Sequence, residues 1–230
     1  MKTIHFYFDP ISPFSWLAFQ KLPEALMGLS HRVLYKPVFL GPLLRARGSL
    51  GPAEIPAKRD WTYRQVSWLG HHLGVPLAMP AVHPFNPLPL LRLALATAIP
   101  EGELGSEPGA VNRYVAEQVL RHVWEGGQDA ADPVRLAALR EVLAEHMNLR
   151  ERSLADPDSD AIKARLRANG DEALAAGAFG VPSFVVDGRL FWGLDSLPML
   201  RDCLAGGEWF NGPDWDAAAQ RPSILEKTAS

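Results

Sequence analysis

Strand-like segments lie near the two ends of this 230-residue chain, and a long helical stretch separates them. Residues 4–8 form a short apolar run, and residues 33–39 alternate well enough for a second strand. Residues 183–192 have the pattern of a hairpin that turns at Asp187-Gly188. Every strong apolar period from residue 58 to about residue 176 is helical. The pattern therefore predicts an α/β fold that is interrupted by a block of helices.

We assign residues 1–45 and 177–230 to the α/β domain and residues 46–176 to an inserted all-helical domain. The stretch 41–56 is rich in Gly and Pro and is expected to be a loop. The tail after Gly206 is expected to be loop-like as well.

Composition excludes several classes of function. Lys plus Arg is 23 and Asp plus Glu is 26, which gives 23 − 26 = −3, so no basic surface for nucleic acid is expected. Cys203 is the only cysteine, which rules out an internal disulfide and a multi-cysteine metal site and suits the cytoplasm. The histidines show no metal-ligand spacing, so no metal is expected. No apolar stretch approaches the roughly 18 residues of a membrane span, and the start does not have the pattern of a signal peptide.

The first strand leads into the turn Asp9-Pro10-Ile11-Ser12-Pro13 and then into a helix. Unpaired N–H groups and the positive end of the helix dipole surround Ser12, and such a place stabilises an anion such as a thiolate. The hydroxyl of Ser12 can donate one more hydrogen bond to that anion. The alternative is that Ser12 only caps the helix, which spacing alone favours.

Two later loops carry candidate binding residues. Val181-Pro182 directly precedes a strand. A cis proline in this place lets the residue before it offer backbone groups to an extended peptide, and the alternative is an ordinary trans proline at the start of a strand. Asp195 and Ser196 precede the last helix, where a carboxylate can pair with an ammonium and a hydroxyl with a carboxylate. A plain helix cap is the alternative for this pair.

Lys58 and Arg59 open a helix, where basic side chains oppose the dipole, so they either hold an anionic substrate or form a solvated surface pair. Asn86, just before Pro87, is either a substrate contact or an N-cap, and the pattern favours the cap.

Five segments in order resemble the motifs of 2-hydroxychromene-2-carboxylate isomerases and kappa-class glutathione transferases. These segments are residues 6–17, 56–59, 85–94, 178–184 and 191–195. The resemblance implies a thioredoxin-like, DsbA-like domain with an inserted helical domain, glutathione as cofactor and a homodimer. Redox relatives carry Cys-x-x-Cys where this chain has Ser12-Pro13-Phe14-Ser15, so dithiol exchange is excluded.

The resemblance also implies roles for individual residues. Ser12 is the catalytic residue and holds the glutathione sulfur. The implied glutathione contacts are Ser12, Lys58, Asn169, Val181, Pro182, Asp195 and Ser196. The implied contacts to a small aromatic carboxylate substrate are Phe14, Lys58 and Asn86. One departure is the loop Arg47-Gly48-Ser49-Leu50, where the family often has a Gly-Asn pair.

The activity that the resemblance implies is glutathione-dependent interconversion of 2-hydroxychromene-2-carboxylate and trans-o-hydroxybenzylidenepyruvate. A thiolate would add to the ring-opened enone, the former double bond would rotate, and elimination would release the trans product. Two alternatives are a kappa-like glutathione transferase or peroxidase and a non-catalytic thioredoxin-like binding module.

Overall fold

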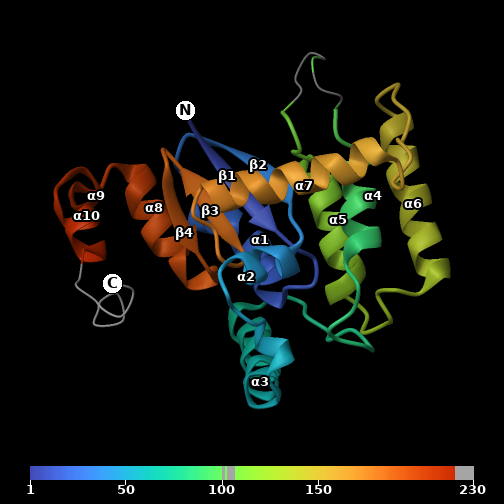
Figure 1. The fold of residues 1–230 in the computed structure, drawn as a ribbon, viewed down its shortest axis with the longest axis horizontal. Helices are drawn as coiled ribbons and strands as arrows, with labels where there is room; N and C mark the ends of the chain where they lie inside the picture. The colour runs from blue at the N-terminus through green and yellow to red at the C-terminus, as the bar shows by residue number, and fades with distance from the viewer. Residues whose placement is uncertain (100–101, 103–106, 221–230) are drawn as a thin grey trace, which may run out of the picture.

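A computed structural model describes residues 1–99, 102 and 107–220 of the chain. Within these residues, four strands form one sheet in the order β2-β1-β3-β4 (Figure 1). The strands are β1 (Lys2–Phe8), β2 (His31–Pro37), β3 (Ser183–Val186) and β4 (Arg189–Trp192). β1 pairs parallel with β2 and antiparallel with β3, which in turn pairs antiparallel with β4. The parallel pair needs a crossover, and the helix that follows β1 supplies it.

The helices fill the remaining described segments. In chain order they are α1 (Pro13–Ala25), α2 (Leu40–Ala46), η1 (Pro52–Glu54), α3 (Pro56–Leu73), α4 (Leu88–Leu95), α5 (Arg113–Trp124), α6 (Pro133–Asn148), α7 (Asp160–Ala175), η2 (Leu194–Ser196), α8 (Leu197–Ala205), α9 (Glu208–Asn211) and α10 (Asp214–Ala219). None of the helices among the described residues is both long and apolar enough to cross a bilayer.

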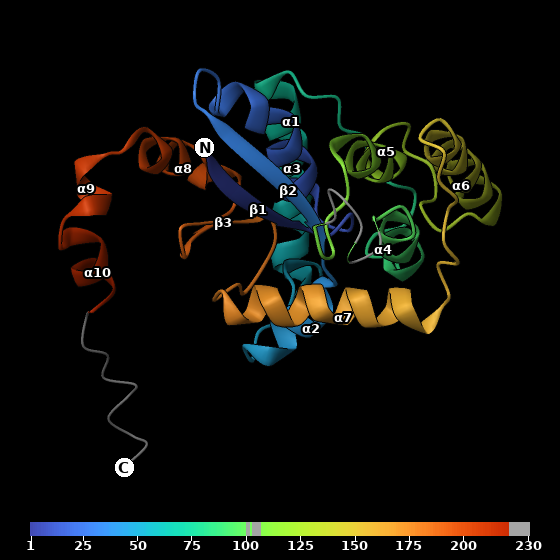
Figure 2. The same cartoon turned by 90° about the horizontal axis from the view of Figure 1, so that it is seen from above.

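The central strand β1 is covered on both faces, with α1 on one side of the sheet and α7 on the other (Figure 2). Ile4, Phe6 and Phe8 belong to the larger apolar core together with residues of α1 and α8. Phe6 stacks on Phe184 of β3 with ring centroids 4.7 Å apart. Tyr7 belongs to a second apolar cluster with residues of α2 and α7. Burial on both faces explains why β1 is a nearly continuous apolar run.

The helical block consists of α4, α5 and α6, which contact one another, while α7 contacts both α4 and β2. In α5, Val115, Val119 and Val123 recur every four residues and are fully buried. Figure 1 shows α7 running from this block across the sheet. The last helix of the predicted inserted segment, residues 46–176, therefore also covers the sheet.

Two stretches that were expected to be loops contain helices. Residues 41–56 include most of α2 and all of η1, and the fully buried Leu43 anchors α2 in the core. Pro42 is compatible with α2 because it lies in the first turn, where no helical N–H bond is lost. The described part of the tail after Gly206 contains α9 and α10, where Phe210 and Trp215 pack with ring centroids 5.4 Å apart, and residues 221–230 lie outside the described residues. The prediction for residues 41–56 relied on local Gly and Pro content, and both predictions missed a buried anchor, Leu43 in α2 and Phe210 in α9.

Candidate functional site

Ser12 stands at the N-terminus of α1, with its side chain 7% exposed. Its hydroxyl oxygen accepts a hydrogen bond from the Ser15 amide at 3.3 Å, so Ser12 does cap the helix. The same hydroxyl donates to the Val181 carbonyl at 3.4 Å. The Ser12 side chain can therefore both cap the helix and stand where an anion is stabilised. Both roles depend on the amides at the start of the helix, which have no partner in a preceding helical turn.

The Val181-Pro182 peptide bond is cis, and β3 begins directly after it. Val181 and Pro182 line a cavity of about 920 Å³ that lies between α1, α3 and the β4–α8 region. The cavity is lined by Phe14, Lys21, Glu24, Ala25, Met27, Gln65, Leu69, Leu73, Val181, Pro182, Trp192, Gly193, Leu194, Asp195, Leu197, Pro198 and Arg201. Ser12 is not part of this lining, but its hydrogen bond to Val181 places it next to the cavity.

The cavity follows α1 from Phe14 to Ala25, which is about 16 Å of helix at 1.5 Å per residue. From α3, the cavity is lined by Gln65, Leu69 and Leu73, which are spaced four residues apart and therefore share one helical face. Sequence reasoning missed these three residues. Their i, i+4, i+8 spacing was visible, but it could not show that this face of α3 opposes α1.

The β4–α8 connection places Asp195 at the cavity and turns Ser196 inward. Asp195 is exposed, and no ion pair to its carboxylate occurs among the described residues. Ser196 uses both its hydroxyl, at 2.8 Å, and its amide, at 3.3 Å, to donate to the Gly193 carbonyl. Gly193 has φ of 94°, and a Cβ there would lie 2.4 Å from the Asp195 Oδ1 atom. The positive φ favours glycine here, and any other residue would also push the Asp195 carboxylate out of its present position.

Lys58, Asn86 and Asn169, which the sequence placed near a ligand, are not among the residues that line this cavity. Lys58 is exposed in the first turn of α3. The Asn86 side-chain oxygen accepts a hydrogen bond from the Leu88 amide at 3.1 Å, as in an Asx turn, so it supports the start of α4 although the N-cap of that helix is Pro87. The structure therefore brings Phe14, Val181, Pro182 and Asp195 together at the cavity, with Ser12 adjacent. Lys58, Asn86 and Asn169 lie outside this group.

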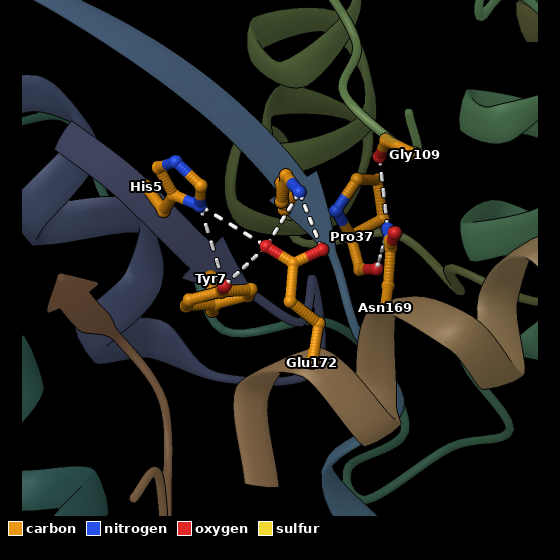
Figure 3. A network of polar contacts seen from close by, with 7 residues as sticks. His5, Tyr7, Pro37, Gly109, Asn169 and Glu172 are labelled. Carbon is orange, nitrogen blue, oxygen red and sulfur yellow. Dashed lines mark hydrogen bonds and ion pairs between the residues drawn. The ribbon is translucent and has the colours of Figure 1, made fainter. Parts of the chain in front are cut away.

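Asn169 lies inside the protein on α7 and is 2% exposed. Its amide nitrogen donates to the carbonyls of Pro37 and Gly109, each at 2.8 Å (Figure 3). The amide is thus used to tie α7 to the end of β2 and to the loop before α5. A contact between Asn169 and glutathione stays a prediction that this geometry does not favour.

One turn along α7, Glu172 forms a polar cluster with β1 and β2 (Figure 3). Tyr7 donates to its carboxylate at 2.7 Å, His5 Nδ1 lies 3.1 Å away, and Lys36 Nζ reaches both oxygens at 2.6 Å. Burial raises the pKa of Glu172, but the bonds from His5, Lys36 and Tyr7 outweigh it and bring that pKa to about 2. Burial, with help from Glu172, raises the pKa of Tyr7. The cluster binds α7 to the sheet.

Asp9, at the end of β1, is fully buried beside Ser12 and was not singled out by the sequence. Its carboxylate accepts hydrogen bonds from the amides of Ile11, at 3.0 Å, and Leu40, at 2.8 Å. Burial raises the pKa of Asp9 to about 7, although the two backbone bonds act in the opposite direction. Asp9 therefore connects the turn before α1 to the start of α2.

No group of three or more His, Cys, Asp or Glu side chains that could hold a metal ion occurs in the described part of the chain. The DSBA-like thioredoxin domain family matches residues 3–205, so the chain belongs to that family. The predicted thioredoxin-like α/β fold with a helical insertion is thereby confirmed.

Named relatives fall into the two groups that the sequence resembles. "Glutathione s-transferase kappa 2" of Caenorhabditis elegans is 27% identical over 92% of this chain and 95% of that protein. The 2-hydroxychromene-2-carboxylate isomerase of Sphingobium xenophagum is 29% identical over 88% of this chain and 98% of that protein. A solved 2-hydroxychromene-2-carboxylate isomerase superposes with a TM-score of 0.65 at 24% identity, covering 91% of this chain and 97% of the other. The similarity to that solved structure supports the assignment of the fold.

Proposed function

We propose that the chain is a glutathione-dependent isomerase that interconverts 2-hydroxychromene-2-carboxylate and trans-o-hydroxybenzylidenepyruvate. The observation that carries the proposal is the placement of Ser12: its hydroxyl, at the N-terminus of α1, contacts the residue before cis-Pro182 at the edge of a large apolar cavity. The named relatives are the second line of support.

Glutathione would extend from Ser12 toward the start of α8. Its cysteinyl backbone would pair with the backbone of Val181, which lines the cavity. Its ammonium group would pair with the exposed Asp195 carboxylate. Ser196 could bind the γ-glutamyl carboxylate only by giving up a bond to the Gly193 carbonyl. We therefore assign the stronger contact to Asp195.

The chemistry would begin with the thiolate. A free thiol has a pKa of about 8.5, and the amides of α1 together with the Ser12 hydroxyl would lower it. The sulfur would attack the conjugated carbon of the ring-opened enone, forming a C–S bond while the π electrons move into an enolate. Rotation about the resulting single bond and expulsion of the thiolate would restore the double bond in the trans form, with no net change in electrons or protons.

The aromatic part of the substrate would lie along the apolar lining, which includes Phe14, Leu69 and Leu73. The cationic residues of the lining are Lys21, which pairs with Glu24, and Arg201, which donates to the carbonyls of Ala25 and Met27. Lys58 is not part of this lining, so its pairing with the substrate carboxylate stays a prediction that this geometry does not favour.

A kappa-like glutathione transferase or peroxidase is the second candidate, and the kappa-class relative favours it. These activities share the thiolate site: the isomerase breaks its C–S bond again, a transferase keeps that bond, and a peroxidase forms none, because its thiolate reduces a hydroperoxide and is itself oxidised. The homodimer and the cytoplasmic location stay predictions.

The deciding experiment incubates the purified protein with 2-hydroxychromene-2-carboxylate, with and without glutathione, and in a parallel reaction with glutathione and an organic hydroperoxide, and follows the products by chromatography. Glutathione-dependent formation of the trans isomer, without consumption of glutathione, supports the isomerase. A stable glutathione conjugate, or reduction of a hydroperoxide with oxidation of glutathione, supports the second candidate instead. Absence of all three, with no binding of glutathione by calorimetry, would overturn both.

A further inference from the structure

The turn of residues 9–12 places Ser12 next to the cavity, and hydrogen bonds from within the turn and from other segments hold it. The Ser12 amide donates to the Asp9 carbonyl at 3.0 Å and closes the turn. The Ile11 amide donates to the Asp9 carboxylate at 3.0 Å. These two bonds leave the carbonyls of Pro10 and Ile11 to be satisfied from outside the turn.

Two ring N–H groups from the helical segment reach these two carbonyls. The indole nitrogen of Trp124, on α5, donates to the Pro10 carbonyl at 2.9 Å. The Nε2 atom of His83, in the loop before α4, lies 2.8 Å from the Ile11 carbonyl oxygen. Residues 83 and 124 are remote from the turn in sequence, so the helical segment holds the turn in place from outside.

The partners of His83 fix which ring nitrogen carries the proton. A carbonyl can only accept, so Nε2 must be protonated. Burial lowers the pKa of His83, although the bond to Ile11 acts in the opposite direction, and the neutral ring leaves Nδ1 as an acceptor. The Tyr63 hydroxyl donates to the His83 carbonyl at 2.9 Å and lies 2.8 Å from Nδ1, so its one O–H proton is shared between these two acceptors. Tyr63 thus orients the ring from α3, a helix that also lines the cavity.

The bond to Ile11 matters because of peptide geometry. The Ile11 carbonyl and the Ser12 amide are the two polar groups of one planar peptide unit. A donor that fixes the direction of the carbonyl therefore also fixes the direction of the Ser12 N–H and the start of the Ser12 side chain. A loosened carbonyl would let the whole unit rotate away from the orientation that closes the turn.

We propose that His83 is a positioning residue which, by holding the Ile11 carbonyl, keeps Ser12 oriented toward the bound sulfur. The catalytic consequence rests on the proposed function, whereas the orientation of the turn does not. Tyr63 acts one step further out by holding the His83 ring.

The test compares His83→Ala with His83→Gln, because the glutamine amide can place an N–H donor close to the position of Nε2. His122→Ala is the matched control: His122 is also half-buried, and its Nε2 also bonds a backbone carbonyl, that of Ala130 at 3.0 Å, away from the turn. Hydrogen exchange of the Ser12 and Ser15 amides reports on the turn without any ligand. We expect exchange to rise about fivefold to tenfold in His83→Ala, the loss of one hydrogen bond, and to return toward the wild-type rate in His83→Gln.

Turnover and binding then connect the turn to catalysis. In His83→Ala we expect kcat to fall about tenfold while affinity for S-methylglutathione, which has no ionisable thiol, stays unchanged. Equal exchange in His83→Ala and His122→Ala, or no recovery in His83→Gln, would overturn the proposal even if glutathione is not the ligand. Should His83→Ala not fold, Tyr63→Phe takes its place, with a smaller change in the same direction expected; unchanged exchange in that variant would overturn the proposal.

Discussion

The Ser12 hydroxyl donates to the carbonyl of Val181 at 3.4 Å, across 169 positions of sequence. This contact joins the N-terminus of α1 to the residue that precedes the cis bond at Pro182. The bond is long, so the hydroxyl can turn toward a stronger acceptor at little cost. A thiolate placed between the two segments is such an acceptor, because hydrogen bonds to charged groups are the stronger ones.

Ser12→Ala should therefore weaken glutathione-dependent turnover at neutral pH by about tenfold, which corresponds to a rise of about one unit in the thiol pKa. At a pH well above the thiol pKa the loss should shrink, since the thiolate then forms without help. The measurement is a pH–rate profile of the wild type and the variant.

Ser159→Ala serves as the control for lost helix capping, because the Ser159 hydroxyl accepts from the Ile162 amide at 3.4 Å at the start of α7, outside the cavity. Both variants should lose about 1 kcal/mol of stability. If Ser12→Ala loses the same factor of activity at every pH, stabilisation of the thiolate is not the role of the hydroxyl.

The sequence was sufficient for the parts of the site that short-range signals define. The strand–turn–helix around Ser12 follows from proline placement and capping, and the β3–β4 hairpin follows from Asp187-Gly188, both of which adopt positive φ. Val181-Pro182 could be located by its place before a strand. These elements needed no knowledge of which surfaces meet.

The missed parts depend on how remote segments pack. Nothing local indicates that Leu69 and Leu73 face α1, or that His83 reaches the carbonyl of Ile11. Packing also decides the surroundings of Asn169: the resemblance implies a ligand contact, while its amide donates from α7 to two backbone carbonyls. Sequence therefore predicted the residues of the loops and not the walls of the cavity.

Leu69→Trp should narrow the cavity beside Phe14 and discriminate against the aromatic substrate. We expect KM for that substrate to rise about tenfold, a typical effect of altering an apolar pocket, while affinity for glutathione is unchanged. Leu149→Trp is the control, since Leu149 is 86% exposed and does not line the cavity. Unchanged KM in Leu69→Trp, measured on a correctly folded variant, would place the aromatic ring elsewhere.

Glu172→Gln should destabilise the fold without changing the catalytic site. The fold lowers the pKa of Glu172 to about 2. The stability that the ionised carboxylate contributes is therefore fully present at a pH above the ordinary pKa of the group, and it is lost as the pH falls through about 2. We expect a loss of about 2 kcal/mol at neutral pH, discounted because the Glu172 side chain is 38% exposed.

Urea unfolding at neutral and acidic pH measures this difference, with the exposed Glu141→Gln as control on α6. The two proteins should converge in stability at strongly acidic pH. A loss for Glu172→Gln that persists unchanged there would show that packing of the side chain, and not its charge, holds α7 to the sheet.

Asp9→Asn should remove a pH dependence from the stability of the protein. Burial raises the pKa of Asp9 to about 7 from 3.8, so the native state binds this proton more tightly than the unfolded chain does. The resulting stability is fully present below the unfolded pKa and is lost as the pH rises through about 7. The slope of the unfolding free energy against pH approaches about 1.4 kcal/mol per pH unit within that window.

Asparagine offers one oxygen to the two amides of Ile11 and Leu40, so Asp9→Asn also changes the unfolding free energy at every pH. The informative quantity is therefore the difference in unfolding free energy between the variant and the wild type as a function of pH. Asp129→Asn is the control, because Asp129 accepts a comparable bond from the Ala131 amide at 2.9 Å outside the core. A difference curve that is flat across the window would mean that Asp9 is ionised in the folded protein and that its two backbone bonds outweigh its burial.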